Sequence, residues 1–392
     1  MQLFKKFKLK AAVFFLIINY SLLITNYCKA QDSSHIRISL LTCAPGNDQL
    51  YETFGHSALR VTDSSSVTDY VFNYGTFNFG DPGFYLKFIR GKLLYYVSVE
   101  DFKDFESDYQ QDDRAITEQL LNFSAEEKIK IEEALINNTR DENKYYKYDF
   151  FFDNCTTRLR DIIETNKHPH PVIKPVMPPG TTFRQAIYQY LDKGKEYWSK
   201  LGIDLLLGAK TDAVMTTAQS QFLPENLMVS LDSANINHQL VISKTNLFST
   251  TPNNNDNSLF TPGILFSSIL IVIILLSLSK NNFIQKFLLG FDGLLFFLTG
   301  LLGIIMVLMW TATDHVLCAN NFNLLWAWPM HSVMAFYIHS KKRWVKKYYL
   351  ATAVLSSVVL LAWFFLPQQM NNSLIPIVLL LIYRSANSYL KT

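Results

Sequence analysis

"YYKYDFFFDNCTTRLRDIIE", residues 145–164, joins an aromatic run to a polar triplet and then to a predicted amphipathic helix. Cys155 stands where that helix should begin, directly after Asp153 and Asn154. The unpaired N–H groups and the positive dipole end of a helix start favour a thiolate, and Arg158 adds positive charge one turn further on. The stretch therefore predicts a nucleophilic cysteine. The alternative is a small side chain that only packs.

A nucleophilic thiolate needs a base beside it, and His56 in "FGHSALRV", residues 54–61, is the strongest candidate. Gly55 permits a close approach of the backbone, and the residues after it predict a strand that starts at His56. A purely structural histidine is the alternative interpretation. No His/Cys cluster has the spacing of a zinc site, so we expect neither a metal nor a cofactor. The other histidines of this region lack comparable surroundings: His35, His168, His170 and His238.

Around these two motifs, residues 31–250 predict one exported domain of the α+β class. Antiparallel-type strands are expected over 35–46, 56–63, 69–79 and 92–100, with polar or Gly/Pro-containing turns between them. Helices are expected over 82–91, over 124–141, after Cys155, and at the end of the Pro-rich segment 169–191. Ser124 followed by Glu127 is a capping-box pattern for the clearest of these helices.

The first 30 residues have the pattern of a secretory signal peptide. Lysines occupy positions 5, 6, 8 and 10, an apolar run extends from Ala11 to Ile24, and Ala30 is a small residue suited to cleavage. An uncleaved anchor is the alternative. Either interpretation places the domain that follows outside the cytoplasm.

A Ser/Thr/Asn-rich segment, residues 251–259, predicts a linker between the exported domain and a strongly apolar region. Residues 260–392 predict a transmembrane domain with about five helices. Four spans plus a re-entrant piece is the alternative arrangement. The five predicted spans are 260–279, 290–311, 324–340, 348–366 and 373–390.

Basic residues orient this transmembrane domain. Lys280, Lys286 and the "KKRWVKK" segment, 341–347, flank loops on one side, whereas the loops 313–323 and 367–373 contain no Lys or Arg. The basic side is expected in the cytoplasm, so the exported domain should lie on the periplasmic side of the inner (cytoplasmic) membrane. The net charge of +3 is spread thinly, and nothing in it indicates nucleic-acid binding.

The cysteine count does not indicate a disulfide framework. Of the four cysteines, Cys43, Cys155 and Cys318 remain after removal of the signal peptide, and an odd number leaves at least one free thiol. Spacing alone does not establish a bridge between Cys43 and Cys318.

Several motifs together resemble one known family. "GHSALRV" (55–61), "VFNYGTFNF" (71–79), "FIRGKLLYYVS" (88–98) and "YDFFFDNCTTRLRDII" (148–163) resemble the periplasmic domain of Lnb-type lipoprotein N-acyltransferases of Bacteroidota. "TDHVLCANNFNLLWAWP" (313–329) resembles the multi-span tail of the same family. The domain is also similar to circularly permuted papain-like (NlpC-like) thiol enzymes.

This resemblance implies a set of catalytic residues. Cys155 corresponds to the nucleophile and His56 to the general base. The third, orienting residue is not fixed by the motifs; we select Asn73, with Tyr74 as the next choice.

The resemblance also implies an activity: a fatty acyl chain passes through a Cys155 thioester to the α-amine of the S-diacylglyceryl cysteine of an apolipoprotein. The expected partners are a phospholipid or other lipid acyl donor, a diacylated lipoprotein acceptor and the membrane. One alternative is a membrane-anchored periplasmic cysteine peptidase or amidase. Another is a non-catalytic envelope assembly or receptor protein.

Further residues are expected to support such a site. Asn154 and Arg158 are predicted to assist the oxyanion or the site, and a helix N-cap is the equal alternative for Asn154. The interfacial loop 313–323 is predicted to dock headgroups or the exported domain. Its candidate residues are Asp314, His315, Asn320 and Asn323.

Overall fold

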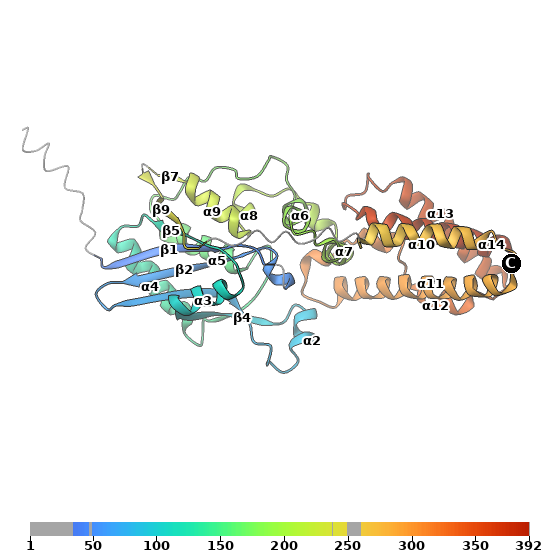
Figure 1. The fold of residues 1–392 in the computed structure, drawn as a ribbon, viewed down its shortest axis with the longest axis horizontal. Helices are drawn as coiled ribbons and strands as arrows, with labels where there is room; N and C mark the ends of the chain where they lie inside the picture. Colours follow the sequence, from blue (N-terminus) through green and yellow to red (C-terminus); the bar gives the residue numbers. More distant parts are fainter. Residues whose placement is uncertain (1–33, 47–48, 237, 249–259, 392) are drawn as a thin grey trace, which may run out of the picture.

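The computed structural model describes residues 34–46, 49–236, 238–248 and 260–391. The predicted signal peptide (1–30) and linker (251–259) lie outside the described residues. The described chain has two parts, a sheet with attached helices followed by a bundle of apolar helices (Figure 1). The predicted mixture of strands and helices followed by apolar helices is confirmed. The permuted papain-like topology stays a prediction.

The sheet has seven strands, all paired antiparallel, in the order β6-β4-β3-β2-β1-β5-β9. β1 lies between β2 and β5, and helices cover both faces, so nearly all of its side chains are buried. The strand predicted to start at His56 does start there. The bounds are β1 Ile36–Cys43, β2 His56–Asp63, β3 Thr68–Thr76, β4 Leu94–Asp101, β5 Ile116–Leu121, β6 Tyr145–Lys147 and β9 Val241–Asn246.

Helices pack on both faces of this sheet. On one face, α4 (Ala125–Thr139), α5 (Cys155–Asn166) and α9 (Pro224–Ser233) bury leucines and isoleucines against it. On the other, α3 (Phe102–Gln111) contributes Phe102 and Phe105. α4 has the predicted capping box, in which Ser124 and Glu127 exchange hydrogen bonds. A two-stranded hairpin, β7 (Asn235–Ile236) and β8 (His238–Gln239), follows α9.

A small helical layer separates the sheet from the bundle. It contains α6 (Phe183–Lys193), α7 (Tyr197–Leu206), η2 (Ala209–Asp212) and α8 (Thr217–Ser220). α6 packs with aromatic residues from the sheet part, whereas Leu201 of α7 belongs to the apolar core of the bundle. The layer therefore joins the two parts through apolar contacts on each side.

The bundle contains α10 (Pro262–Ser277), α11 (Asn282–Thr311), α12 (Met330–Met334), α13 (Arg343–Leu361) and α14 (Ile375–Lys391). Within the described residues, three helices are long and apolar enough to cross a membrane: Asn282–Thr311, Arg343–Leu361 and Asn372–Leu390. α10 is apolar but shorter. α11 begins earlier than the predicted span because Asn281 caps it.

The span predicted over 324–340 is not formed by one continuous helix. The chain there forms η4 (Phe322–Leu325), α12 and η5 (Ala335–Tyr337) in succession. Pro329, at the start of α12, has no N–H with which to continue a preceding helix. The backbone of this segment packs directly on α11 at Gly300 and Gly303. Any larger side chain at these two positions would collide with it.

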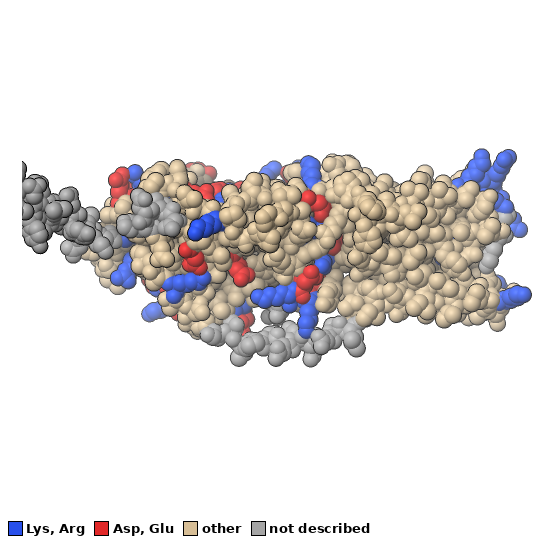
Figure 2. All heavy atoms as spheres, turned by 90° about the horizontal axis from the view of Figure 1, so that it is seen from above, with Lys and Arg blue, Asp and Glu red and all other residues tan. Residues whose placement is uncertain are grey.

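The distribution of charge agrees with a membrane-spanning bundle. Figure 2 shows a broad band without Lys, Arg, Asp or Glu on the visible face of the bundle, and basic side chains gather at its far end. That end carries the α10–α11 connection with Lys280 and the start of α13 with "KKRWVKK", 341–347. The sheet part lies at the opposite end, as the loop charges predicted.

Candidate active site

Cys155 is the first residue of α5, and the start of this helix is tightly fixed. Oδ1 of Asn154 accepts a hydrogen bond from the backbone N–H of Thr157 (2.8 Å), whose Oγ1 accepts one from the Asn154 N–H (2.8 Å). The Asn154 amide also donates to the carbonyls of Phe150 (2.9 Å) and Phe222 (2.8 Å). The thiol is therefore held in one position at the positive end of the helix, and its residue is only 7% exposed.

His56 stands opposite this helix start, at the first position of β2. Its Nε2 donates a hydrogen bond to Oδ1 of Asn73 on β3, at 2.6 Å. Since Nε2 is engaged there, Nδ1 is the ring nitrogen left for the hydrogen bond between His56 and Cys155. Gly55 is required just before it, because its φ is +76° and a Cβ would lie 2.7 Å from the Cys43 carbonyl oxygen.

Asn73 is in turn held by a carboxyl group, since its Nδ2 donates to Oε1 of Glu100 on β4 at 3.3 Å. Glu100, Asn73, His56 and Cys155 thus form a chain that crosses three strands and reaches α5. Tyr74, the other candidate for the orienting residue, belongs to the core on the opposite face and accepts a hydrogen bond from Asn138. The geometry therefore favours Asn73 as the partner of the imidazole.

Histidine and thiol shift each other's titration. Burial alone would raise the pKa of Cys155, but the charge and hydrogen bond of His56 outweigh it and lower that pKa to about 7. Burial would lower the pKa of His56, but Cys155 and the bond to Asn73 outweigh it and raise that pKa. The backbone N–H of Ser57 also stabilises the Cys155 thiolate. The pair therefore favours thiolate and imidazolium near neutral pH.

This shift predicts how alkylation of Cys155 depends on pH. A folded-state pKa near 7 means that the thiolate forms above about pH 7 and is lost below it. The rate of Cys155 alkylation by iodoacetamide should therefore reach half its maximum near pH 7. At that pH the thiolate fraction should be about fifty-fold higher than that of a thiol with a pKa of 9. Cys43 should stay silent, because burial raises its pKa to about 12. The rate is measured by mass spectrometry of the Cys155 peptide.

The same measurement tests Asn73. Asn73→Ala removes a hydrogen bond that raises the pKa of His56, so less imidazolium remains and the alkylation profile should move to higher pH. Ser98→Ala is the matched control. Ser98 faces Asn73 across the β3–β4 pair, and its hydroxyl bonds Thr76 and the backbone carbonyl of Asn73 but not the His56 ring. An unmoved profile for Asn73→Ala would contradict the orienting role.

Arg158 and Asn154 support the site without pointing at the sulfur. Arg158 forms an ion pair with Asp153 (2.7 Å), and its guanidinium lies 3.5 Å from the centre of the Tyr146 ring. The side-chain amide of Asn154 is fully used by the cap and by two carbonyls. Asn154 is thus the helix cap, the alternative considered for it, rather than an oxyanion donor.

The four candidate residues of the 313–323 loop lie where the bundle contacts the sheet part and the helical layer. Asp314 pairs with Lys147 (3.0 Å), and Nε2 of His315 bonds the carbonyl of Phe88 (3.1 Å). Asn323 donates to the Asp204 carbonyl at 3.0 Å, and the Asn320 carbonyl accepts from the N–H of Ala209 at 3.1 Å. These bonds dock the two parts of the chain against each other.

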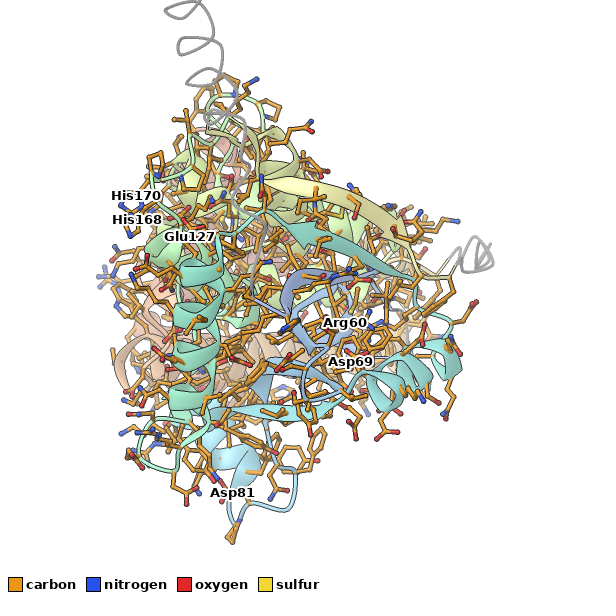
Figure 3. All side chains as sticks on the ribbon, turned by 90° about the vertical axis from the view of Figure 1, so that its left-hand side faces the viewer. Arg60, Asp69, Asp81, Glu127, His168 and His170 are labelled. Carbon is orange, nitrogen blue, oxygen red and sulfur yellow. The ribbon has the colours of Figure 1, made fainter. Side chains whose placement is uncertain are left out.

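Two further candidate histidines lie away from this site. His168 and His170 lie at an edge of the domain near Glu127 (Figure 3), where Glu127 accepts from the His168 backbone N–H and His170 bonds the carbonyl of Glu164. Within the described residues, no group of His, Cys, Asp and Glu could hold a metal ion. Cys43, Cys155 and Cys318 are all free thiols.

Several residues of the site and of its support were not predicted. Gly75, with φ +90°, occupies the bulge of β3, where a Cβ would lie 3.6 Å from Cβ of Cys155 and 3.4 Å from the Tyr148 ring. A glycine inside the strand pattern "FNYGTFNF" is the signal that could have indicated it. Glu100 carries no comparable signal, and neither does the fully buried Arg184, whose guanidinium pairs with Asp204 (2.7 Å) and Asp212 (2.9 Å).

The fold and the site together define a class: a membrane protein whose extramembrane sheet domain carries a Cys–His–Asn arrangement. Residues 25–187 match the family model of the Lnb N-terminal periplasmic domain, and residues 254–392 match that of the Lnb transmembrane domain. The chain belongs to the Lnb family, and the sheet domain is its periplasmic part. No curated protein and no solved structure matches the chain.

Proposed function

We propose that this chain is a lipoprotein N-acyltransferase that carries a fatty acyl group on Cys155. The observation that supports it most is the position of the thiol–imidazole pair. Cys155 follows Lys147 by eight residues, and Lys147 pairs with Asp314, three residues beyond the end of α11. A lipid ester and a lipidated amine both lie at a membrane surface, so a site on a domain that is docked to the end of a membrane helix suits both substrates.

In the first half of the reaction, the Cys155 thiolate attacks the carbonyl carbon of a lipid ester. N–H groups at the start of α5 stabilise the oxyanion. The C–O bond to the alcohol then breaks, and the leaving oxygen takes a proton from Nδ1 of His56. The products are an acyl thioester on Cys155, neutral His56 and a deacylated lipid alcohol.

In the second half, the α-amine of the diacylglyceryl cysteine attacks the thioester carbonyl, and His56 accepts the proton that the amine loses. The C–S bond breaks, which returns the Cys155 thiolate and releases an N-acylated lipoprotein. Asn73 keeps Nδ1 directed at the sulfur in both halves, because it binds the other ring nitrogen.

Mass spectrometry of a lipoprotein N-terminal peptide tests this function. Cells with the protein should contain the peptide with one additional amide-linked acyl chain, which is missing from cells that lack it. Purified protein with a synthetic diacylated lipopeptide and phospholipid should make the same amide. Release of free fatty acid or cleaved peptide, without amide, would contradict the transferase and identify a thiol hydrolase.

A further inference from the structure

A lobe between β3 and β4 exposes apolar side chains at the membrane end of the sheet domain. This α2 lobe, residues 77–91, contains the short helix α2 (Phe84–Ile89) and projects beyond the sheet toward the bundle (Figure 1). Asp81 marks its outer edge in Figure 3. Five of its large apolar residues are between 51% and 74% exposed: Phe79, Tyr85, Leu86, Phe88 and Ile89.

Hydrogen bonds hold this lobe beside the outer end of α11. His315 bonds the carbonyl of Phe88, and the N–H of Asp314 donates to the carbonyl of Arg90 at 2.9 Å. α11 ends at Thr311, so these contacts lie just beyond its apolar length. Arg90 and Lys92 are exposed at the same end of the lobe. Exposed apolar side chains with cations beside them, located at the end of a membrane helix, suit a bilayer interface with anionic headgroups.

A continuous row of aromatic rings leads from the lobe to the nucleophile. The ring centroids of Phe79 and Phe84 are 4.9 Å apart, and those of Phe84 and Phe77 are 5.8 Å apart. The Phe77 ring contacts that of Tyr95 at 5.4 Å, and Tyr95 stacks on Tyr148 at 4.5 Å. Tyr148 borders Gly75, which in turn borders Cys155. Gly75 places no side chain between the Tyr148 ring and Cys155.

We propose that the α2 lobe inserts into the periplasmic surface of the lipid bilayer, and that an acyl chain reaches Cys155 along the aromatic row. The occupant is the lipid leaflet itself, because the lobe is hydrogen-bonded to the loop that ends a membrane-spanning helix. The acyl route rests on the proposed function, whereas insertion of the lobe does not.

Spin labelling tests the insertion. A nitroxide is attached to Leu86→Cys in a full chain that also carries Cys155→Ala, so that the reactive thiol is not labelled. The protein is reconstituted in vesicles of phosphatidylethanolamine and phosphatidylglycerol. Leu86 should be more accessible to oxygen than to a water-soluble nickel chelate. Val67→Cys is the control, since Val67 is 90% exposed in the β2–β3 turn at the other end of the strands and should show the reverse. If the labels at positions 86 and 67 are equally accessible to the nickel chelate, the lobe does not insert into the bilayer. That result would overturn the proposal.

A charge substitution tests the route. Leu86→Glu combined with Phe88→Glu should lower acyl transfer from vesicle phospholipid by about tenfold or more, because carboxylates oppose insertion. Alkylation of Cys155 by iodoacetamide should keep its rate, and Val67→Glu should keep both. Unchanged transfer in the double variant would overturn the route. If the unmodified chain shows no transfer at all, the proposed function fails, and the spin-label result still decides the insertion.

Discussion

Replacing Cys155 by alanine should abolish N-acylation, with a fall in rate on the order of 10⁴-fold or more, because it removes the thiolate that carries the acyl chain. The variant should fold, since alanine is tolerated at the first position of a helix and Asn154 keeps its capping bonds. The N-terminal peptide of a lipoprotein, measured by mass spectrometry in cells that carry only the variant, should lack the amide-linked chain.

Cys318→Ala is the matched control for this experiment. Cys318 is also a buried free thiol, but it lies in η3 (Val316–Cys318) at the contact with the bundle and has no imidazole partner in the described hydrogen bonds. Its substitution should leave N-acylation intact. If Cys155→Ala supported N-acylation as well as the unmodified chain does, Cys155 would only pack, and the non-catalytic alternative would hold.

The parts of the fold that could be predicted depend on local signals. The cap of α4 needs only Ser124 and Glu127, and the start of β2 needs only the glycine before His56. By contrast, the edge strand β9 is almost fully exposed, so its sequence lacks apolar alternation, and β6 has only three residues. Their pairing depends on neighbours distant in the chain, which no local pattern reports.

The candidate site divides in the same way. Cys155 and His56 each stand at the start of an element, where sequence patterns are strongest, so both could be selected. The hydrogen bond from Asn73 to Glu100 depends on strand register. The contact of Gly75 with Cys155 forms only when α5 packs against the bulge of β3. The breaks in the segment 324–340 could not be predicted from hydropathy, because they depend on close packing against Gly300 and Gly303 of α11.

A polar cluster around Arg184 links the helical layer to the bundle, and breaking it should cost much stability. Arg184 is fully buried and pairs with Asp204 and Asp212, and Asp204 also accepts from Asn371 of the bundle at 2.8 Å. Arg184→Met leaves the buried carboxylate of Asp204 and the partly buried carboxylate of Asp212 without their cation. The cost should be about 3–5 kcal/mol. The apparent melting temperature in detergent should fall by roughly 6–20 °C.

Two further variants test whether the loss of stability comes from buried charge. Lys130→Met removes the exposed pair with Glu126 on α4, which water already screens, so the melting temperature should hardly change. Adding Asp204→Asn and Asp212→Asn to Arg184→Met removes the uncompensated charges while keeping the side-chain shapes, so part of the lost stability should return. A single variant as stable as Lys130→Met, or a triple variant less stable than the single one, would contradict this account. Because the Arg184 cluster joins the sheet domain to the bundle, its loss should also lower N-acylation while the pH profile of Cys155 alkylation stays unchanged.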